Sequence, residues 1–216
     1  MKLNQSYAVF GLGRYGKAVA RELSEDGAEV LAVDVNEDVV NAASLEIPYC
    51  KCADVTDPEV IKQLGISNVD VVIISMAGDL EASVMATMLC KEAGVKTVIV
   101  KCSNEMNCKI MKKVGADQVV IPESESGIRL AKNLLSSGFV DIIELSKDVS
   151  MVELSVRPEW EGKNLIELSL RKKYGINVVA LIEGKEVCTN INPEQALSAS
   201  MKLIVIGNTA KLSKLK

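Results

Sequence analysis

The segment that most constrains the fold is Gly11-Leu12-Gly13-Arg14-Tyr15-Gly16, which directly follows the short apolar run Tyr7–Phe10. A helix-like stretch continues from Arg14 to about Glu25, and a second apolar run ends in Asp34. Strand, glycine turn, helix, strand and acid in this order are typical of a dinucleotide-binding βαβ unit. The segment therefore predicts that the protein holds a nucleotide.

Each glycine of that unit has its own physical role. We expect Gly11 to allow the tight turn, Gly13 to let a pyrophosphate approach the backbone, and Gly16 to let the helix pack close to the strand. Helix N–H groups and the positive end of the helix dipole would then face the phosphates. Asp34 lies 21 positions after Gly13. Its carboxylate can accept hydrogen bonds from both ribose hydroxyls and would repel a 2′-phosphate, which disfavours NADP.

Alternating strand and helix signals continue to residue 122 and predict a doubly wound, parallel, six-stranded Rossmann-like sheet. Beyond the first two strands, we expect strands at Tyr49–Ala53, Val69–Ser75, Thr97–Lys101 and Gln118–Ile121. We expect helices at Asn36–Leu45, after Asp57-Pro58, at Asp79–Ala93 and at Asn104–Val114. Ligands bind at the carboxyl ends of such strands. That rule groups Gly11–Gly16, Asp34, Asp54, Met76–Asp79 and Lys101 around one crevice.

The pattern changes after Pro122, so we divide the chain into a nucleotide-binding domain (1–122), a crossover helix with linker (123–140) and a C-terminal lobe (141–216). Glu123 to about Ser137 predicts an amphipathic helix with Ile128, Ala131, Leu134 and Leu135 on one stripe. The lobe predicts a small α+β module. Its expected elements are strands at Met151–Val156, Asn177–Ile182, Lys185–Cys188 and Leu203–Ile206, and a helix at Leu165–Leu170.

Composition excludes several classes of protein. A net charge of −4 does not indicate the excess of basic residues that is typical of nucleic-acid-binding proteins. No apolar stretch approaches the roughly 20 residues that cross a bilayer, so we expect a cytoplasmic protein. The chain has no histidine, the commonest catalytic acid or base. Six cysteines, mostly in or beside apolar runs, are expected to be buried free thiols.

Several motifs together resemble the RCK family (regulator of potassium conductance), and more narrowly the cytosolic gating subunits of bacterial Ktr/Trk potassium uptake systems. In the first half these motifs are Phe10–Gly16, Val33–Asn36, Gly115–Asp117 and Ile121–Glu123. In the second half they are Gly162–Leu165, Leu170-Arg171, Tyr174–Ile176 and Leu203–Gly207. The resemblance runs over almost the whole chain and includes domain order and length.

The resemblance implies a regulatory protein rather than an enzyme. Such subunits pair into homodimers, assemble into an octameric ring and attach peripherally to a membrane-embedded potassium-translocating subunit. An adenine nucleotide changes the shape of the ring and so the conductance; Ktr-like members bind ATP or ADP, which we favour, and Trk-like members bind NAD or NADH. Related C-terminal lobes bind cyclic di-AMP. Family lobes often carry Gly-Asp shortly before the last strand, and this chain departs from that pattern with Ser198–Lys202.

The resemblance also assigns roles to residues. Arg14 would reach the γ-phosphate, and Glu123 would approach the same phosphates across the dimer, directly or through a cation. Asp54 would lie near the adenine, and Lys101 would border the phosphates. The whole expected nucleotide site is Gly11, Gly13, Arg14, Tyr15, Gly16, Asp34, Val35, Asn36, Asp54, Val55, Met76, Ala77, Gly78, Lys101 and Glu123.

Simpler interpretations stand beside these. Arg14 can be a solvated arginine, although a cation is unfavourable at a helix N-terminus unless an anion is near. Glu123 can be an ordinary first-turn acid, and Asp54 a turn former. An NAD-dependent oxidoreductase is the competing function. It would need a proton donor near the nicotinamide, and no tyrosine of this chain is followed four positions later by lysine.

Overall fold

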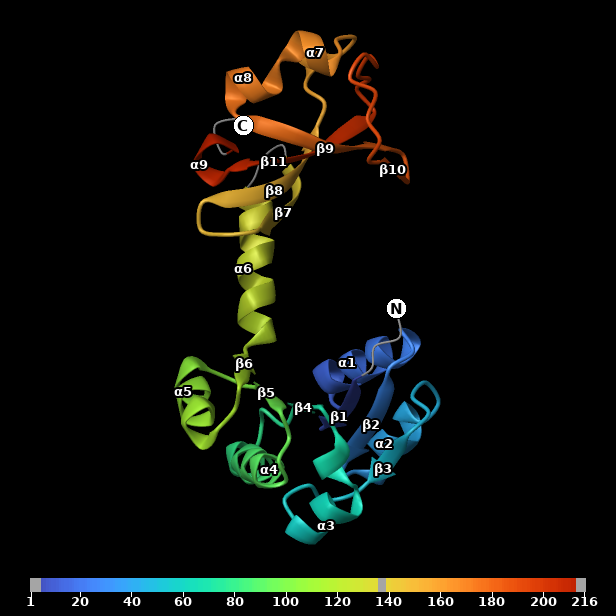
Figure 1. The fold of residues 1–216 in the computed structure, drawn as a ribbon, viewed down its shortest axis with the longest axis vertical. Helices are drawn as coiled ribbons and strands as arrows, with labels where there is room; N and C mark the ends of the chain where they lie inside the picture. The colour runs from blue at the N-terminus through green and yellow to red at the C-terminus, as the bar shows by residue number, and fades with distance from the viewer. Residues whose placement is uncertain (1–4, 136–138, 213–216) are drawn as a thin grey trace. The chain divides into compact units, whose positions relative to one another are not determined.

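The computed structural model describes residues 5–135 and 139–212 (Figure 1). The chain divides into two compact units, Met1–Pro122 and Glu123–Lys216. Within the described residues, no helix has both the length and the apolar character needed to cross a bilayer.

The first unit is built on a six-stranded parallel sheet with the order β3-β2-β1-β4-β5-β6. The strands are β1 (Ser6–Phe10), β2 (Glu29–Asp34), β3 (Cys50–Cys52), β4 (Val71–Ile74), β5 (Thr97–Lys101) and β6 (Gln118–Val120). The order reverses between β1 and β4, and this switch point is where doubly wound sheets bind ligands at their carboxyl ends. The predicted fold class is confirmed; β3, β4 and β6 are shorter than expected.

Five helices connect these strands and cover both faces of the sheet: α1 (Arg14–Glu25), α2 (Glu37–Ala43), α3 (Pro58–Gln63), α4 (Leu80–Glu92) and α5 (Glu105–Val114), with a short 3-10 turn, η1 (Ile66–Asn68). Side chains alternate between the two faces because successive residues of a strand point in opposite directions. Val9 and Ile73 pack with Ala20 of α1 and Ala43 of α2. The other face of the sheet packs on α3, α4 and α5.

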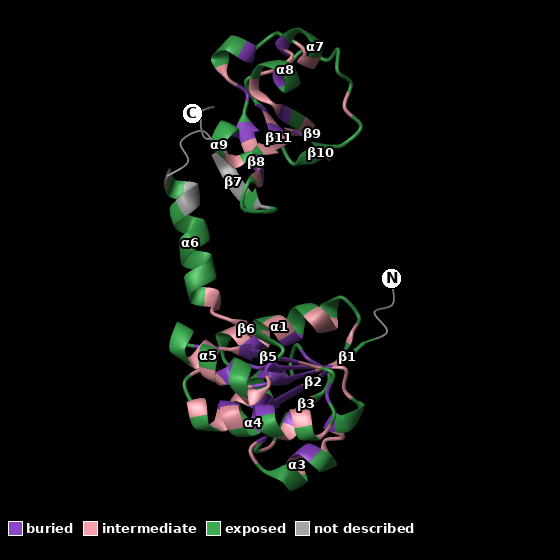
Figure 2. Cartoon of the chain, turned by 60° about the vertical axis from the view of Figure 1, so that its left-hand side comes forward, coloured by how far each residue is buried: buried purple, intermediate pink, exposed green. Residues whose placement is uncertain are grey.

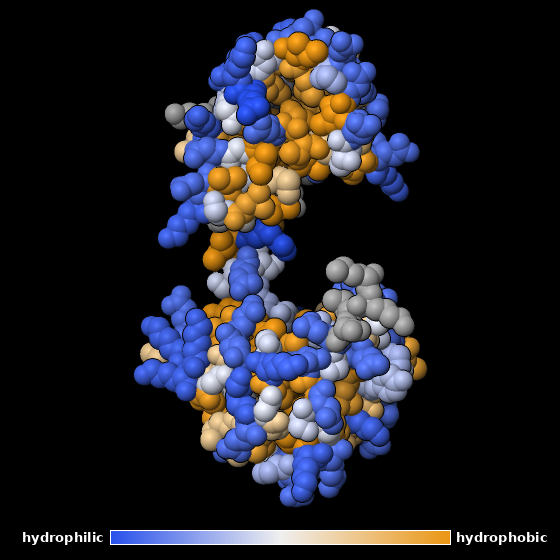
Figure 3. Space-filling model, viewed as in Figure 1, coloured by the Kyte–Doolittle hydropathy of each residue, from blue (hydrophilic) through white to orange (hydrophobic). Residues whose placement is uncertain are grey.

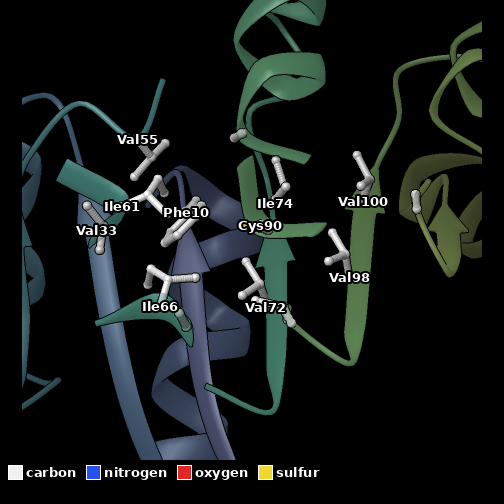
Figure 4. Close-up of a cluster of buried hydrophobic side chains, with 14 of the residues drawn as sticks. Phe10, Val33, Val55, Ile61, Ile66, Val72, Ile74, Cys90, Val98 and Val100 are labelled. Carbon is white, nitrogen blue, oxygen red and sulfur yellow. The ribbon is translucent and has the colours of Figure 1, made fainter. Parts of the chain in front are cut away.

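That second face holds the larger core of the unit. Figure 4 shows Phe10 of β1 beside Val33 of β2 and Ile61 of α3, and Val72 and Ile74 rising from β4. Figure 2 shows the strands of this sheet largely in the colour of buried residues, with exposed residues on the outer sides of the helices. Burial on both faces explains why β4 reads as the continuous apolar run Val71–Ile74.

The second unit carries a five-stranded antiparallel sheet with the order β10-β9-β11-β8-β7. Its elements are α6 (Pro122–Leu135, which begins on the last residue of the first unit), β7 (Phe139–Glu144), β8 (Val149–Ser155), η2 (Pro158–Trp160), α7 (Leu165–Leu168), α8 (Leu170–Tyr174), β9 (Ile176–Glu183), β10 (Glu186–Cys188), β11 (Met201–Asn208) and α9 (Thr209–Leu212). The small α+β lobe is confirmed, including the hairpin of β9 and β10.

Three expectations for this unit or for the cysteines need correction. The helix expected at Leu165–Leu170 is two helices, because Ser169 adopts a left-handed conformation with φ of 47°. Strand β7 was not expected at all. Of the six cysteines, Cys90 and Cys102 are buried, Cys52 and Cys188 are exposed, and the remaining two are half-buried.

The stripe expected on α6 includes Ile128 and Leu134, whose side chains are 54% and 78% exposed. The expected end of this helix at Ser137 lies outside the described residues. Figure 3 shows one face of the molecule, on which hydrophilic side chains surround apolar areas in both units.

Candidate nucleotide site

A cavity of about 370 Å³ opens at the carboxyl ends of β1–β4, on the side of the sheet where nucleotides bind in doubly wound folds. Its lining contains six of the expected site residues, Gly11, Asp34, Val35, Asp54, Val55 and Met76. It also contains five others: Val33, Ala53, Thr56, Asp79 and Ala82. Four separate strand ends thus contribute to one cavity, as the strand-end rule predicts.

The glycine turn between β1 and α1 has the geometry that its sequence predicts. Gly11 has φ of +86°, and a Cβ there would lie 2.9 Å from Met76 Cγ. A Cβ on Gly16 would lie 1.9 Å from the carbonyl oxygen of Gly11, so only glycine allows α1 to pack this closely. A Cβ on Gly13 would meet nothing within 4 Å. Gly13 therefore has no packing role in the fold, and its surface is open to a ligand.

The N-terminus of α1 differs from those of α2–α5. Those four helices are capped by the side chains of Asn36, Asp57, Asp79 and Asn104, and each has an acid in its first turn. Helix α1 has neither a side-chain cap nor a first-turn acid, and begins at Arg14. Its first N–H groups and its dipole are therefore not balanced by a side chain, which suits an incoming phosphate.

Arg14 is exposed beside this helix end. Among residues 5–135 and 139–212, no side chain or backbone group forms a hydrogen bond or ion pair with its guanidinium. By contrast, Arg21 of the same helix pairs with Glu46 and Glu25.

Asp34 is the last residue of β2, and its carboxylate accepts hydrogen bonds from the backbone of two adjacent loops. Its Oδ2 accepts a hydrogen bond of 2.7 Å from the N–H of Leu12, and its Oδ1 accepts one of 2.9 Å from the N–H of Asn36. The carboxylate thus holds the glycine turn and the start of α2 together while it lines the cavity. Each carboxylate oxygen can accept more than one hydrogen bond, so a ribose hydroxyl can still be added.

Asp54 is both a turn former and a lining residue, so the two interpretations of it are compatible. Its Oδ1 accepts from the N–H of Thr56 at 2.9 Å and from the Thr56 hydroxyl at 2.7 Å. These hydrogen bonds from Thr56 lower the pKa of Asp54, because they stabilise its ionised form. Asp54 therefore carries its charge at neutral pH.

Apolar side chains complete the cavity. Val35 lines the cavity and is 71% exposed, so most of its apolar surface is accessible to a ligand. Val55 is buried in the core, and Met76 packs against the same core. An apolar surface beside the acidic end of β2 suits the face of a base.

The remaining expected residues lie around the cavity or elsewhere. Lys101 ends β5, and its Nζ is 5.7 Å from the centre of the Tyr15 ring, so this pair flanks the start of α1. Asn36 caps α2 with its side chain. Ala77 and Gly78 lie in the β4–α4 loop but do not line the cavity.

Glu123 is exposed in the first turn of α6 and belongs to the second unit. In the described part of the chain, no three histidine, cysteine or acidic side chains are grouped to hold a metal ion. The cation expected at Glu123 stays a prediction.

Sequence reasoning did not assign five lining residues to the site individually: Val33, Ala53, Thr56, Asp79 and Ala82. Asp79 fell within a group expected at the crevice, but an aspartate before a helical run is most simply a cap, which it also is. Thr56 follows Asp54 in a turn, and Ala82 lies inside α4. The strand-end rule points to the first residues after a strand and has no signal for residues further into the next element.

Comparisons with known proteins agree across the chain. The TrkA-N domain matches residues 7–122, and the TrkA-C domain matches residues 149–216. The chain is 38% identical over 212 residues to Ktr system potassium uptake protein C of Bacillus subtilis, covering 98% of this chain and 96% of the relative. It is 36% identical to Ktr system potassium uptake protein A of Vibrio alginolyticus, covering 97% and 96%.

Solved structures share the fold at lower identity. The GsuK channel has a TM-score of 0.69 at 18% identity and covers 99% of this chain, which spans 39% of that channel chain. The GsuK channel bound to NAD has a TM-score of 0.64 at 17% identity, with 98% and 38% covered. With two family domains over most of its length and Ktr relatives above 30% identity, this chain belongs to the Ktr/TrkA family of potassium uptake proteins, built on the RCK architecture.

Proposed function

We propose that this chain is the nucleotide-sensing regulatory subunit of a potassium uptake system and gates a membrane potassium-translocating partner. One observation carries the proposal. The turn between β1 and α1 lines, through Gly11, a cavity with acidic side chains, and it leads into a helix that begins at the exposed Arg14 with no side-chain cap and no first-turn acid. A phosphorylated nucleoside fits both features, because its sugar and base can occupy the cavity while its phosphates bind at the N-terminus of α1.

The proposed mechanism is a shift between conformations rather than bond-making. A ligand moves such an equilibrium only as far as it binds one state better than the other. ATP and ADP differ by the γ-phosphate, and we assign its recognition to Arg14, with Glu123 approaching the phosphates across a dimer. ATP would then favour one dimer geometry, and ADP or the free protein another.

The direct test is Arg14→Ala, with titration calorimetry of ATP and ADP on the purified chain. We expect ATP to lose about tenfold or more in affinity, because a charge-assisted contact to the terminal phosphate is lost, while ADP changes little. Arg21→Ala is the matched control, an arginine on the same helix that pairs with acids instead. An ATP-to-ADP affinity ratio that is the same in the Arg14 variant and the wild type would contradict the mechanism.

The nucleotide itself is proposed as ATP or ADP, with NAD or NADH as the alternative. Asp34 suits the adenosine ribose of either. A solved relative of the same fold is described as bound to NAD. Mass spectrometry of the nucleotide that copurifies with the protein distinguishes the two classes.

Oxidoreductase chemistry has less support. The polar side chains that line the cavity are three aspartates and Thr56, whose hydroxyl donates to Asp54. In the described part of the chain, the residues that line this cavity include no histidine, lysine or tyrosine, the side chains that commonly supply the proton in such reactions.

We further propose the domain division and the assembly that the family implies. The domains span residues 1–122, 123–140 and 141–216, and two chains form a homodimer through the first domain and α6. The dimers form an octameric ring in the cytoplasm, which attaches to the inner face of the membrane through the channel subunit. The exposed Ile128 and Leu134 on α6 support a subunit contact there. Light scattering of the purified chain with and without ATP measures the size of the ring.

Two further ligands remain proposals. A cation at the phosphates would use Glu123 together with phosphate oxygens. Cyclic di-AMP would use a second cavity of about 390 Å³ in the C-terminal lobe, whose lining includes Ser169, Arg171 and Asn177. The departure from the family pattern at Ser198–Lys202 lies outside that lining. Calorimetry of cyclic di-AMP with wild type and Arg171→Ala tests the second ligand.

A further inference from the structure

We propose that Ser83, a buried serine of α4 that does not itself line the nucleotide cavity, is a positioning residue for nucleotide binding, because its hydroxyl fixes the β4–α4 loop against the glycine turn. This inference rests on the nucleotide-binding function proposed above. It adds a residue outside the cavity on which the affinity for the nucleotide depends.

The β4–α4 loop forms one side of the cavity and contacts the glycine turn. Met76 and Asp79 line the cavity. The N–H of Ser75 donates to the carbonyl of Phe10 at 2.7 Å. A Cβ built on Gly11 would lie 2.9 Å from Met76 Cγ and 3.0 Å from the carbonyl oxygen of Ser75, so the loop lies directly against the turn. The position of the loop therefore shapes the cavity and supports the turn at the same time.

The hydroxyl of Ser83 holds this loop. It donates to the carbonyl oxygen of Met76 at 3.0 Å and to that of Asp79 at 2.8 Å, and the residue is only 2% exposed. The bond to Asp79 spans four residues, which is common for a serine in a helix. The bond to Met76 spans seven residues and reaches beyond the start of α4. One buried hydroxyl thus ties the backbone of two cavity-lining residues to the helix.

Removal of this hydroxyl should loosen the loop without unfolding the first unit. Each carbonyl oxygen keeps a backbone donor, because the N–H of Asp79 donates to Met76 at 2.9 Å and the N–H of Ser83 donates to Asp79 at 3.1 Å. Neither oxygen is left without a partner, which is the condition that makes a lost buried hydrogen bond most costly. Alanine is also a better helix former than serine. We therefore expect Ser83→Ala to be folded, with a loop that is held less firmly against the glycine turn.

Thr87 offers a matched control on the same helix. It is fully buried, and its hydroxyl donates to the carbonyl of Ser83 at 2.7 Å. This hydrogen bond lies within α4 and does not involve the loop. Valine keeps the branched shape of threonine at Cβ. Thr87→Val therefore removes a buried hydroxyl from α4 while the anchor of the loop stays in place.

The experiment is titration calorimetry of ADP and ATP on the full-length wild type, Ser83→Ala and Thr87→Val. Circular dichroism melting sets a titration temperature at which all three proteins are folded. We expect Ser83→Ala to weaken both nucleotides by about tenfold, because binding must then also order the loop. The ATP-to-ADP affinity ratio should stay at the wild-type value, since recognition of the γ-phosphate is assigned to Arg14. Thr87→Val should bind both nucleotides within about twofold of the wild type.

Amide hydrogen exchange measured by NMR without ligand tests the anchor directly. The N–H of Asp79 closes the loop onto Met76, so its exchange reports how often this turn opens. We expect this amide to exchange faster in Ser83→Ala than in the wild type, and at the wild-type rate in Thr87→Val. Unchanged exchange in Ser83→Ala would overturn the anchoring of the loop by this hydroxyl.

The outcomes separate this inference from the function beneath it. A Ser83→Ala variant with wild-type affinity for both nucleotides would overturn the positioning role and leave nucleotide binding intact. Equal losses of affinity in Ser83→Ala and Thr87→Val would overturn it too, because the loss would then come from the helix and not from the loop. A wild type that binds no adenine nucleotide of any kind would overturn the proposed function itself, and this inference with it.

Discussion

Replacing Gly16 by alanine should destabilise the first unit, because this glycine is needed for the packing of α1 rather than for contact with a ligand. The added Cβ would lie 1.9 Å from the carbonyl oxygen of Gly11, whereas Cβ atoms in proteins essentially never approach within 3.0 Å. Helix α1 would therefore have to move by about 1.1 Å or more away from the turn. The obstructing atom is backbone, so no side-chain rotation relieves the contact.

The turn itself cannot easily give way. The N–H of Gly11 donates to the carbonyl of Val33 at 2.8 Å, and Ser75 Cβ lies only 3.1 Å from the added atom on the other side. Overpacking of a well-packed site costs about 1–3 kcal/mol, and a backbone clash of this size belongs at the upper end. A loss of about 3 kcal/mol corresponds to a fall of roughly 10 °C in the melting temperature of the first unit.

Gly13→Ala is the matched control, because a Cβ there meets nothing within 4 Å. Without ligand we expect it to lower the free energy of unfolding by about 1 kcal/mol or less, because alanine is a poorer N-cap than glycine although nothing obstructs its Cβ. With nucleotide it should lower affinity, because the phosphates approach that surface.

The measurement is thermal melting followed by circular dichroism on both variants and the wild type. Fluorescence of Trp160, the single tryptophan, follows the second unit in the same samples. A Gly16 variant that melts within about 2 °C of the wild type would refute the packing argument. A Gly13 variant that is equally destabilised would refute the division of roles between the two glycines.

Three further predictions follow from the site and the thiols. Asp34→Asn should lower stability by about 1–2 kcal/mol in urea unfolding, because both carboxylate oxygens accept from N–H groups and an amide can serve only one of them. Thr56→Val should raise the pKa of Asp54 toward its ordinary value, which a carbon-13 NMR titration measures. In the wild type, the stability that the lowered pKa provides is present at neutral pH and is lost as the pH falls through the pKa of Asp54 in the folded state. Burial raises the pKa of Cys90 to about 12, so Ellman's reagent should modify the exposed Cys188 in the native protein but Cys90 only after unfolding.

The first unit was largely predictable because its signals are redundant. A parallel strand covered on both faces is apolar throughout, so Val71–Ile74 stands out in the sequence. The helix caps at Asn36 and Asp57 were also predicted, because short polar side chains before a helical run have few other uses. Strand ends were less predictable, since the apolar run continues past the last hydrogen bond of the ladder.

The second unit was harder to predict for two physical reasons. Strand β7 lies at the edge of the sheet in the described part of the chain, and its register with β8 shifts between Phe139 and Ile142, so its sequence shows no regular alternation. Ser169 breaks the helical run with a left-handed conformation that a serine does not announce, as a glycine would.

In the site, spacing alone assigned Asp34 to a ribose, but not the two hydrogen bonds that the fold already places on it. Because Oδ2 holds the N–H of Leu12 inside the glycine turn, a hydroxyl that binds this carboxylate draws on the same charge that fixes the phosphate loop. Under the proposed function, a ribose bound at the end of β2 would therefore be linked to the conformation of the β1–α1 loop through this one side chain. A sensor needs such a link, because a ligand can shift an equilibrium only through groups whose interactions differ between the two states.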